Sequence, residues 1–154
     1  MDIHQINSQE DLSFDESQVD LIVREVLSFL SLDGDELFIH FVTSEEIACL
    51  HGTFFQDPTP TDCITFPIDA LNPSHIGPKV LGEVFICPKM ALSYMPENPL
   101  AELTLYIIHT LLHLKGYDDQ NESDIAIMRA KEQEILAFLE EKNLVLSNTL
   151  LSIK

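Results

Sequence analysis

Residues 98–119 read NPLAELTLYIIHTLLHLKGYDD, and this stretch decides how the rest of the chain is interpreted. Asn98 followed by Pro99 is a strong helix start, because a proline at the first helical position gives up no hydrogen bond. Gly116 is the expected stop, since glycine readily adopts the left-handed conformation that ends helices. Between them the sequence is apolar on nearly every helical face. A helix of that kind is normally buried, so we expect it at the centre of the domain.

Patterns on both sides of this helix predict further elements. Apolar residues recur at helical spacing from Ser13, and we expect that helix to end at Asp33-Gly34. Ser44 is expected to cap the next helix. The apolar tail from Leu144 is short, so it either docks or frays. The other predictions are a short edge strand at residues 1–8, strands at 36–43, 62–66 and 80–87, a loop at 67–79, and helices at about 90–94 and 121–142.

The composition is that of an ordinary globular chain, with 45% hydrophobic and 22% charged residues among 154. This length suits a single domain, which we expect to span residues 1–154. Eight basic against 26 acidic residues give a net charge of −18, which disfavours unassisted binding to nucleic acid or anionic membranes. Scattered cysteines, together with no signal peptide and no membrane-spanning run, predict a cytoplasmic protein with reduced thiols and no membrane partner.

His109 and His113 give the central helix its chemistry. Being four residues apart, they share one helical face and can supply two imidazole ligands to one metal ion. Gly116 then lets the chain fold back, so that Asp118 or Asp119 can reach the same ion; the frame H-x-x-x-H-x-x-G-x-x-D places Asp119 last. The alternative is a pair of hydrogen-bonded core histidines, each of which would need partners for two ring nitrogens away from water. The complete frame favours metal binding.

Other functions of such a histidine pair fit less well. Zinc peptidases of the H-E-x-x-H type carry their general base directly after the first histidine, and Thr110 stands there instead. The helical spacing also does not suit an iron oxygenase with two histidines and one carboxylate. For the remaining histidines we expect no direct catalytic role: His4, His40, His51 and His75.

Three motifs resemble those of a known family, the YbeY endoribonucleases, also called rRNA maturation factors. The first, H-G-x-L-H-L-x-G-Y-D-H, is matched from His109 to Asp118 at its fixed positions except Thr110. In place of the second, P-T-D-V-L-S-F, residues 60–66 read PTDCITF, and in place of the third, L-G-D-I-x-I-s-P, residues 81–88 read LGEVFICP. Their order and spacing agree, and the resemblance covers about residues 35–140.

The resemblance implies an α+β fold, in which a small mixed sheet and helices pack around a central metal-bearing helix. It implies one divalent metal ion, usually zinc, and cleavage of single-stranded RNA. The implied roles are maturation of the 3′ end of the small-subunit rRNA and ribosome quality control. The expected partners are therefore rRNA and the small ribosomal subunit or a protein associated with it, and not DNA.

Two of the departures from the family pattern bear on the chemistry of the site. Asp119 stands where the family has its third histidine ligand; a carboxylate is a legitimate zinc ligand, but it shifts the metal preference toward iron or manganese. Phe55 stands where the family has an arginine, the natural partner of a phosphate or of a developing phosphorane charge. Three lysines are candidates to replace this arginine: Lys79, Lys89 and Lys115.

These residues define a hypothesis for the site. The metal ligands are His109, His113 and Asp119, and a water activated by the metal attacks the phosphodiester. Asp118 either orients a ligand or the water, or serves only as a turn carboxylate. The candidate substrate-binding residues come from a neighbouring strand: Thr61 and Asp62. No further catalytic residue is assigned.

The competing hypothesis is a ribosome-associated binding protein with a mainly structural metal and little catalysis. The acidic charge and the missing arginine favour it, because an RNA cleft on such a chain needs help from the metal, from a few lysines or from a partner protein. The two hypotheses differ in the metal site itself. A catalytic metal keeps a coordination position open, whereas a structural metal is closed off by protein ligands.

Overall fold

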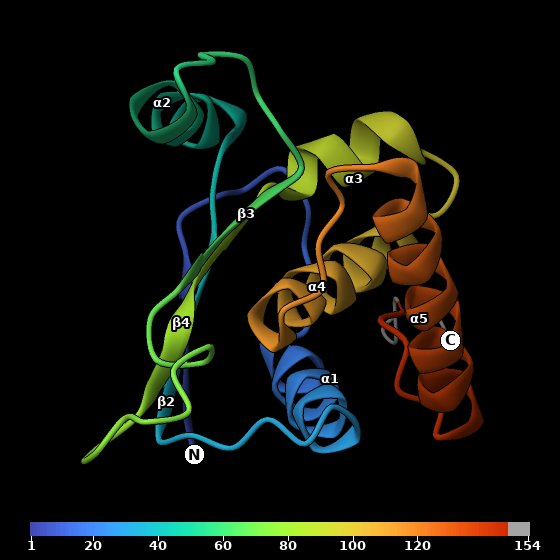
Figure 1. Cartoon of the computed structure of the whole chain (residues 1–154). Coiled ribbons are helices and arrows are strands. Elements are labelled where there is room, and N and C mark those ends of the chain that lie inside the picture. Colours follow the sequence, from blue (N-terminus) through green and yellow to red (C-terminus); the bar gives the residue numbers. More distant parts are fainter. Residues whose placement is uncertain (148–154) are drawn as a thin grey trace.

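The computed structural model describes residues 1–147, and its elements follow the predicted order (Figure 1). The strands are β1 (Asp2–Asn7), β2 (Glu36–Phe41), β3 (Cys63–Pro67) and β4 (Val80–Ile86). The helices are α1 (Glu16–Phe29), α2 (Ser44–Phe55), α3 (Pro88–Tyr94), α4 (Pro99–Lys115) and α5 (Glu122–Glu141). The apolar tail begins by docking, because Leu146 is buried and its N–H bonds to Thr104 Oγ1 at 3.2 Å. The rest of the tail lies outside the described residues.

The strands form one mixed sheet in the order β1-β2-β4-β3. β1 runs parallel to β2 and β2 runs parallel to β4, whereas β3 pairs antiparallel with β4. β1 and β3 are therefore the two edges, which confirms the predicted N-terminal edge strand. The α+β class with a small mixed sheet is confirmed as well. Within residues 1–147, the structure has no helix with the length and apolar character needed to cross a membrane.

α4 is the central helix, as predicted. It packs against the sheet, α1, α3 and α5, and helices α1, α4 and α5 lie on one side of the sheet (Figure 1). Its start at Pro99 and its stop at Gly116, where φ is 109°, are both as expected, although the Asn98 side chain makes no capping hydrogen bond. The fully buried side chains of α4 supply the middle of the core: Leu103, Ile107, Ile108, Leu111, Leu112 and Leu114.

The predicted end of the first helix is wrong. α1 ends at Phe29, before Asp33-Gly34, because Ser31 adopts a left-handed conformation with φ of 55°. The N–H of Leu32 then bonds back to the carbonyl of Leu27 at 2.9 Å, a bond that closes many helix ends. This early turn places the Leu32 side chain in the core.

The predicted cap of α2 is off by one residue. Thr43, not Ser44, is the cap: its Oγ1 accepts a hydrogen bond from the Glu46 N–H at 3.1 Å, and Glu46 Oε1 accepts one from the Thr43 N–H at 3.2 Å. α2 does not join the main core. Ile47 packs in a smaller apolar cluster with Ile64 of β3, on the other face of the sheet. This packing brings the C-terminal end of α2 close to the edge strand.

Gly82 in β4 marks a close approach between the sheet and the central helix. A Cβ atom at this position would lie 2.6 Å from Leu114 Cδ2 and 2.8 Å from the carbonyl oxygen of Phe66. A glycine inside a strand often marks such a close backbone approach. The absence of a side chain lets the C-terminal part of α4 press against β4 and β3.

Candidate metal centre and cavity

The C-terminal part of α4 presents two imidazole rings to the same point. His109 and His113 stand one helical turn apart, with ring centroids 4.6 Å apart and ring planes at 87°. Their Nε2 atoms are 3.1 Å apart. Both rings are about three-quarters buried, so they form the inner wall of a site and not a mobile surface pair.

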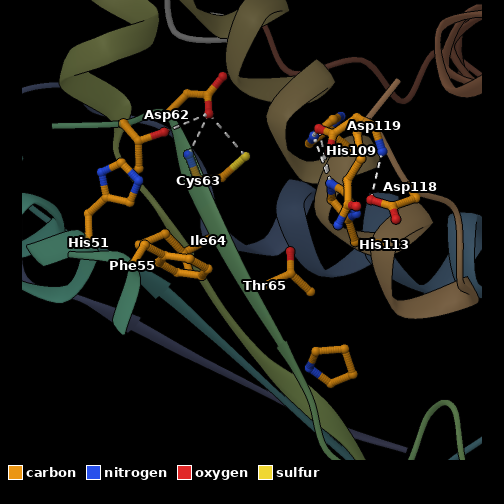
Figure 2. Close-up of a pocket in the computed structure, with 13 residues that line it drawn as sticks. His51, Phe55, Asp62, Cys63, Ile64, Thr65, His109, His113, Asp118 and Asp119 are labelled. Carbon is orange, nitrogen blue, oxygen red and sulfur yellow. Dashed lines mark hydrogen bonds and ion pairs between the residues drawn. The ribbon is translucent and has the colours of Figure 1, made fainter. Parts of the chain in front are cut away.

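The turn after α4 supplies the third group. Gly116 reverses the chain, and Asp119 Oδ2 then lies 3.4 Å from His109 Nε2 and 3.5 Å from His113 Nε2. Asp118 does not reach this point; its Oδ1 accepts a hydrogen bond from the Asp119 N–H at 2.8 Å. The turn thus places the Asp119 carboxylate beside the two histidines, whereas the Asp118 carboxylate bonds within the turn (Figure 2).

The other nitrogen of each ring is fixed by an acceptor. His109 Nδ1 donates to Glu132 Oε2 of α5 at 2.9 Å, and His113 Nδ1 donates to the Tyr117 carbonyl at 3.0 Å. Since a carboxylate and a carbonyl only accept, both Nδ1 atoms carry the proton and both Nε2 atoms of the neutral rings hold a lone pair. Two lone pairs and the Asp119 carboxylate thus face one another at short range, an arrangement that calls for a cation between them.

The spacing of these three atoms fits a metal ion. Ligands about 2.0–2.2 Å from a tetrahedral zinc lie about 3.3–3.6 Å from one another. The observed separations run from 3.1 to 3.5 Å. Rings held at Nδ1 by a carboxylate or a carbonyl are also typical of histidines that bind metal through Nε2. Among the described residues, this group is one of two in which three potential ligand atoms gather; the other is Asp2, His4 and Glu36, at the start of β1 and β2.

Sequence reasoning missed Glu132. Its position carried a signal, because a carboxylate between Met128 and Ile135 falls on the apolar face of α5. The residue shapes the electrostatics of the site. Burial by itself lowers the pKa of His109, but the hydrogen bond to Glu132 and the charges of Glu132 and Asp119 outweigh it, so the net pKa is raised above 6.5.

A cavity of about 440 Å³ opens beside the three groups. Thr61 and Asp62 line it, so the structure brings both predicted substrate-binding residues to the same cavity as His109, His113 and Asp119. Asp62 also has a structural role, since its Oδ1 accepts a hydrogen bond from the Cys63 N–H at 2.8 Å where β3 begins. The cavity extends to both sides of the edge strand β3 (Figure 2).

Comparison with known proteins decides the family. The model of the family "Endoribonuclease YbeY" matches residues 4–140 of this chain. The chain belongs to the YbeY endoribonuclease family. This membership confirms the resemblance drawn from the three motifs, and with it the expectation of an enzyme of the hydrolase class.

Individual YbeY proteins are similar over nearly the whole chain. The endoribonuclease YbeY of Protochlamydia amoebophila is 42% identical over 145 residues, which cover 92% of this chain and 95% of that protein. The endoribonuclease YbeY of Chlamydia trachomatis is 37% identical over 144 residues, covering 91% and 89%. The solution structure of TM1509 from Thermotoga maritima shares the fold, with a TM-score of 0.54 at 19% identity over 92% of this chain and 94% of that one.

Phe55, at the position where the resemblance led us to expect an arginine, lies in the cavity. This residue, at the end of α2, lines the cavity together with His51, for which we expected no direct catalytic role. The lysines proposed to replace the arginine do not line it: Lys79, Lys89 and Lys115. An adjoining cavity of about 760 Å³ shares Asp62, His109 and Asp119 and contains Arg129 of α5. In the described chain, Arg129 is the one basic Lys or Arg side chain that lines either cavity.

The remaining histidines lie away from the two cavities. His40 Nε2 is 2.8 Å from Glu83 Oε1, and His75 Nε2 bonds to the Pro78 carbonyl at 2.7 Å. His4 stacks on Phe38 with ring centroids 4.6 Å apart. These contacts give each of the three a local structural partner.

Proposed function

We propose that this chain is a metal-dependent endoribonuclease that cleaves single-stranded RNA. The observation that carries the proposal is the convergence of His109 Nε2, His113 Nε2 and Asp119 Oδ2 within 3.5 Å of one another at the wall of a cavity. Three protein ligands are the number found in catalytic zinc sites, in which a fourth position stays open for water or substrate. Family membership supports the assignment of RNA as the substrate.

The chain's own residues would hold and orient the cation. His109, His113 and Asp119 supply the donor atoms, and Glu132 and the Tyr117 carbonyl fix the two rings through Nδ1. A bound divalent cation supplies a Lewis acid for a phosphoryl oxygen and lowers the pKa of a water ligand. The position near the C-terminal end of α4 also favours a cation, because carbonyl groups and the negative end of the helix dipole face that end.

Zinc is the proposed metal. Imidazole nitrogen suits zinc well, and a carboxylate oxygen is also a common zinc ligand. The Asp119 carboxylate adds one negative charge to the ligand set, so manganese or iron should compete more effectively than at a site with three histidines.

We propose that Thr61 and Asp62 contact the substrate and that Asp118 holds the turn. None of the three is a proposed metal ligand. The Thr61 hydroxyl lines the cavity and can donate to a phosphate oxygen. Asp62 lines both cavities and can accept a hydrogen bond from a ribose hydroxyl or a water. Asp118 positions Asp119 by accepting a hydrogen bond from the backbone N–H of Asp119.

We propose rRNA as the substrate, in maturation of the 3′ end of the small-subunit rRNA and in ribosome quality control.

The net charge of −18 also bears on the partners. A chain so acidic is repelled by free RNA unless a metal or another protein compensates. We therefore propose that the small ribosomal subunit, or a protein associated with it, delivers the RNA strand to the cavity.

The test is a cleavage assay on protein purified without an affinity tag. We expect about one equivalent of divalent metal by mass spectrometry, cleavage of a short unstructured RNA, and loss of cleavage after chelation that the same metal restores. His113→Ala should lose both metal and cleavage, whereas His40→Ala should keep both, because His40 lies in β2 away from the cavities. Cleavage that survives chelation, or a metal-loaded protein without cleavage, contradicts the proposal.

A second candidate is a ribosome-associated binding protein with a structural metal. The observation that favours it is the acidic lining of the first cavity, where no Lys or Arg of the described chain stands beside Asp62, Asp118 and Asp119. This candidate predicts that metal-loaded protein binds small subunits but cleaves no RNA. The cleavage assay above therefore separates the two functions.

A further inference from the structure

Two large aromatic side chains are exposed at the end of α2. Phe54 and Phe55 show 59% and 55% of their surface to solvent, although α2 buries Ile47 completely on its other face. An exposed aromatic pair of this kind costs solubility and commonly marks a binding surface. The two rings differ in one respect, because Phe55 lines the cavity beside the metal-binding groups and Phe54 does not.

Neighbouring aromatic rings support Phe55 in its place. The His51 ring lies 5.6 Å away, and its Nδ1 is fixed by the Thr59 carbonyl at 2.9 Å. The Phe66 ring of β3 lies 6.4 Å away and within 23° of parallel. Figure 2 shows His51 and Phe55 on one side of β3 and the His109, His113 and Asp119 group on the other. A ligand crossing the edge strand would touch both.

The charge around Phe55 restricts what this ligand can use for binding. The lining of the shared cavity contains three carboxylates and, in the described part of the chain, no Lys or Arg. Phosphate contacts, which normally supply most of the affinity for nucleic acid, are therefore scarce here. A nucleobase carries no charge, and stacking on an aromatic ring needs no basic partner.

We propose that Phe55 forms a base-stacking subsite for an unpaired nucleotide next to the scissile phosphate. This inference rests on the proposed function, since it assumes that the substrate is RNA. The ring of Phe55 stacks on the face of the base, and His51 closes the subsite at its side. A base within a duplex is covered on both faces by its neighbours, so this subsite selects single-stranded RNA. The stacking face is tolerant of base identity, because every base has a π-face.

The test compares substitutions at two adjacent phenylalanines. Single-turnover cleavage of a short unstructured RNA, measured against protein concentration, gives an apparent Kd and a maximal rate. We expect Phe55→Ala and Phe55→Leu to raise the apparent Kd by about 5- to 100-fold. Phe55→Tyr should stay close to wild type, because it keeps the ring. Phe54→Ala, an equally exposed neighbour outside the cavity, is the matched control and should also stay close to wild type.

An RNA that lacks one base identifies the contact. We expect wild-type protein to lose affinity for RNA with a single abasic nucleotide at one position beside the cleavage site. Phe55→Ala should be insensitive to the same change, because the stacking partner is already gone. Equal losses in wild type and Phe55→Ala would overturn the subsite.

The chain contains no tryptophan, so Phe55→Trp introduces a single fluorescent reporter. Stacking of a base should quench its emission when RNA is added, and the abasic RNA should quench it less. If wild type cleaves RNA but Phe55→Ala and Phe55→Leu match it in apparent Kd, the subsite is wrong and the proposed function stands. If wild type neither cleaves nor binds RNA, the proposed function itself has failed.

Discussion

Glu132 Oε2 lies 2.9 Å from His109 Nδ1, across the interface between α5 and α4. This contact joins two helices and sets the chemistry of one ring. Because the carboxylate only accepts, it keeps the proton on Nδ1 and turns the Nε2 lone pair toward His113 and Asp119.

Replacing this carboxylate should weaken the site without removing any ligand. For Glu132→Gln we expect metal affinity to fall by about 10- to 100-fold, because the ring loses its charged partner and becomes a poorer ligand. In the metal-free variant the pKa of His109, followed by NMR, should drop, since the hydrogen bond and charge of Glu132 raise it in wild type. Glu134→Gln is the matched control, because Glu134 pairs with Lys131 at 2.7 Å on the same helix. Unchanged affinity in Glu132→Gln would contradict the assigned role.

Removal of either imidazole should abolish stoichiometric metal binding. We expect His109→Ala and His113→Ala to be isolated with much less than one equivalent of metal, because two donor groups make a poor site. Mass spectrometry of untagged protein measures this directly. His75→Ala, whose ring bonds only to the loop around it, should keep the wild-type metal content. Equal metal in all variants would place the metal elsewhere.

Chelation should lower the thermal stability of the protein. A ligand that binds only the folded state stabilises it, by about 2.7 kcal/mol when its concentration is 100 times its Kd. Without a cation, the two Nε2 atoms and the Asp119 carboxylate, which lie 3.1–3.5 Å apart, also lose the ligand bonds that would join them. We expect a lower Tm in calorimetry after treatment with a chelator, and recovery when zinc is restored. A Tm that does not move on chelation of metal-loaded protein contradicts this.

The two aspartates after Gly116 should behave differently. Asp119→His should keep metal binding and raise the preference for zinc over manganese, since imidazole suits zinc and a carboxylate suits harder ions. Asp119→Ala should weaken binding sharply. For Asp118→Ala we expect a smaller loss, about 10- to 100-fold, because Asp118 contacts only the backbone N–H of Asp119. Competition titrations with both metals measure these effects. Metal retained by Asp119→Ala but lost by Asp118→Ala would reverse the assignment.

Gly82→Ala should destabilise the fold. The added methyl group would lie 2.8 Å from the Phe66 carbonyl oxygen, which belongs to a paired strand and cannot move freely. We expect a loss of at least about 1–3 kcal/mol in the free energy of unfolding, measured by urea denaturation. Gly52→Ala, where the nearest atom is 3.3 Å away, should cost less. Equal stability of wild type and Gly82→Ala would contradict the close packing around Gly82.

Local patterns in the sequence predicted the centre of this molecule well. The start of α4, its stop at Gly116 and the shared face of His109 and His113 all follow from neighbours within a turn or two. The predicted end of α1 was wrong because Ser31 adopts a positive φ, which a serine does not require. That residues 1–154 form one domain stays a prediction.

The surroundings of the site depend on contacts that the sequence does not reveal by spacing. Glu132 meets His109 from another helix, and the cavity needs β3 at the sheet edge between α2 and α4. The lysines expected near the site stand outside the cavity for the same reason, since their location depends on packing over long sequence separations. Phe55 and His109 line the same cavity only because the fold brings them together.

All the groups that define the metal centre lie within one continuous segment, from His109 on α4 through the Gly116 turn to Glu132 on α5. Most of the turn from Gly116 to Asn121 is exposed, so it can open locally while α4 stays packed against the sheet. Such local opening has its own free energy, separate from that of global unfolding. Occupancy of the centre would then set how often amide protons in the turn exchange with solvent, and a bound cation would restrain the motion of this turn.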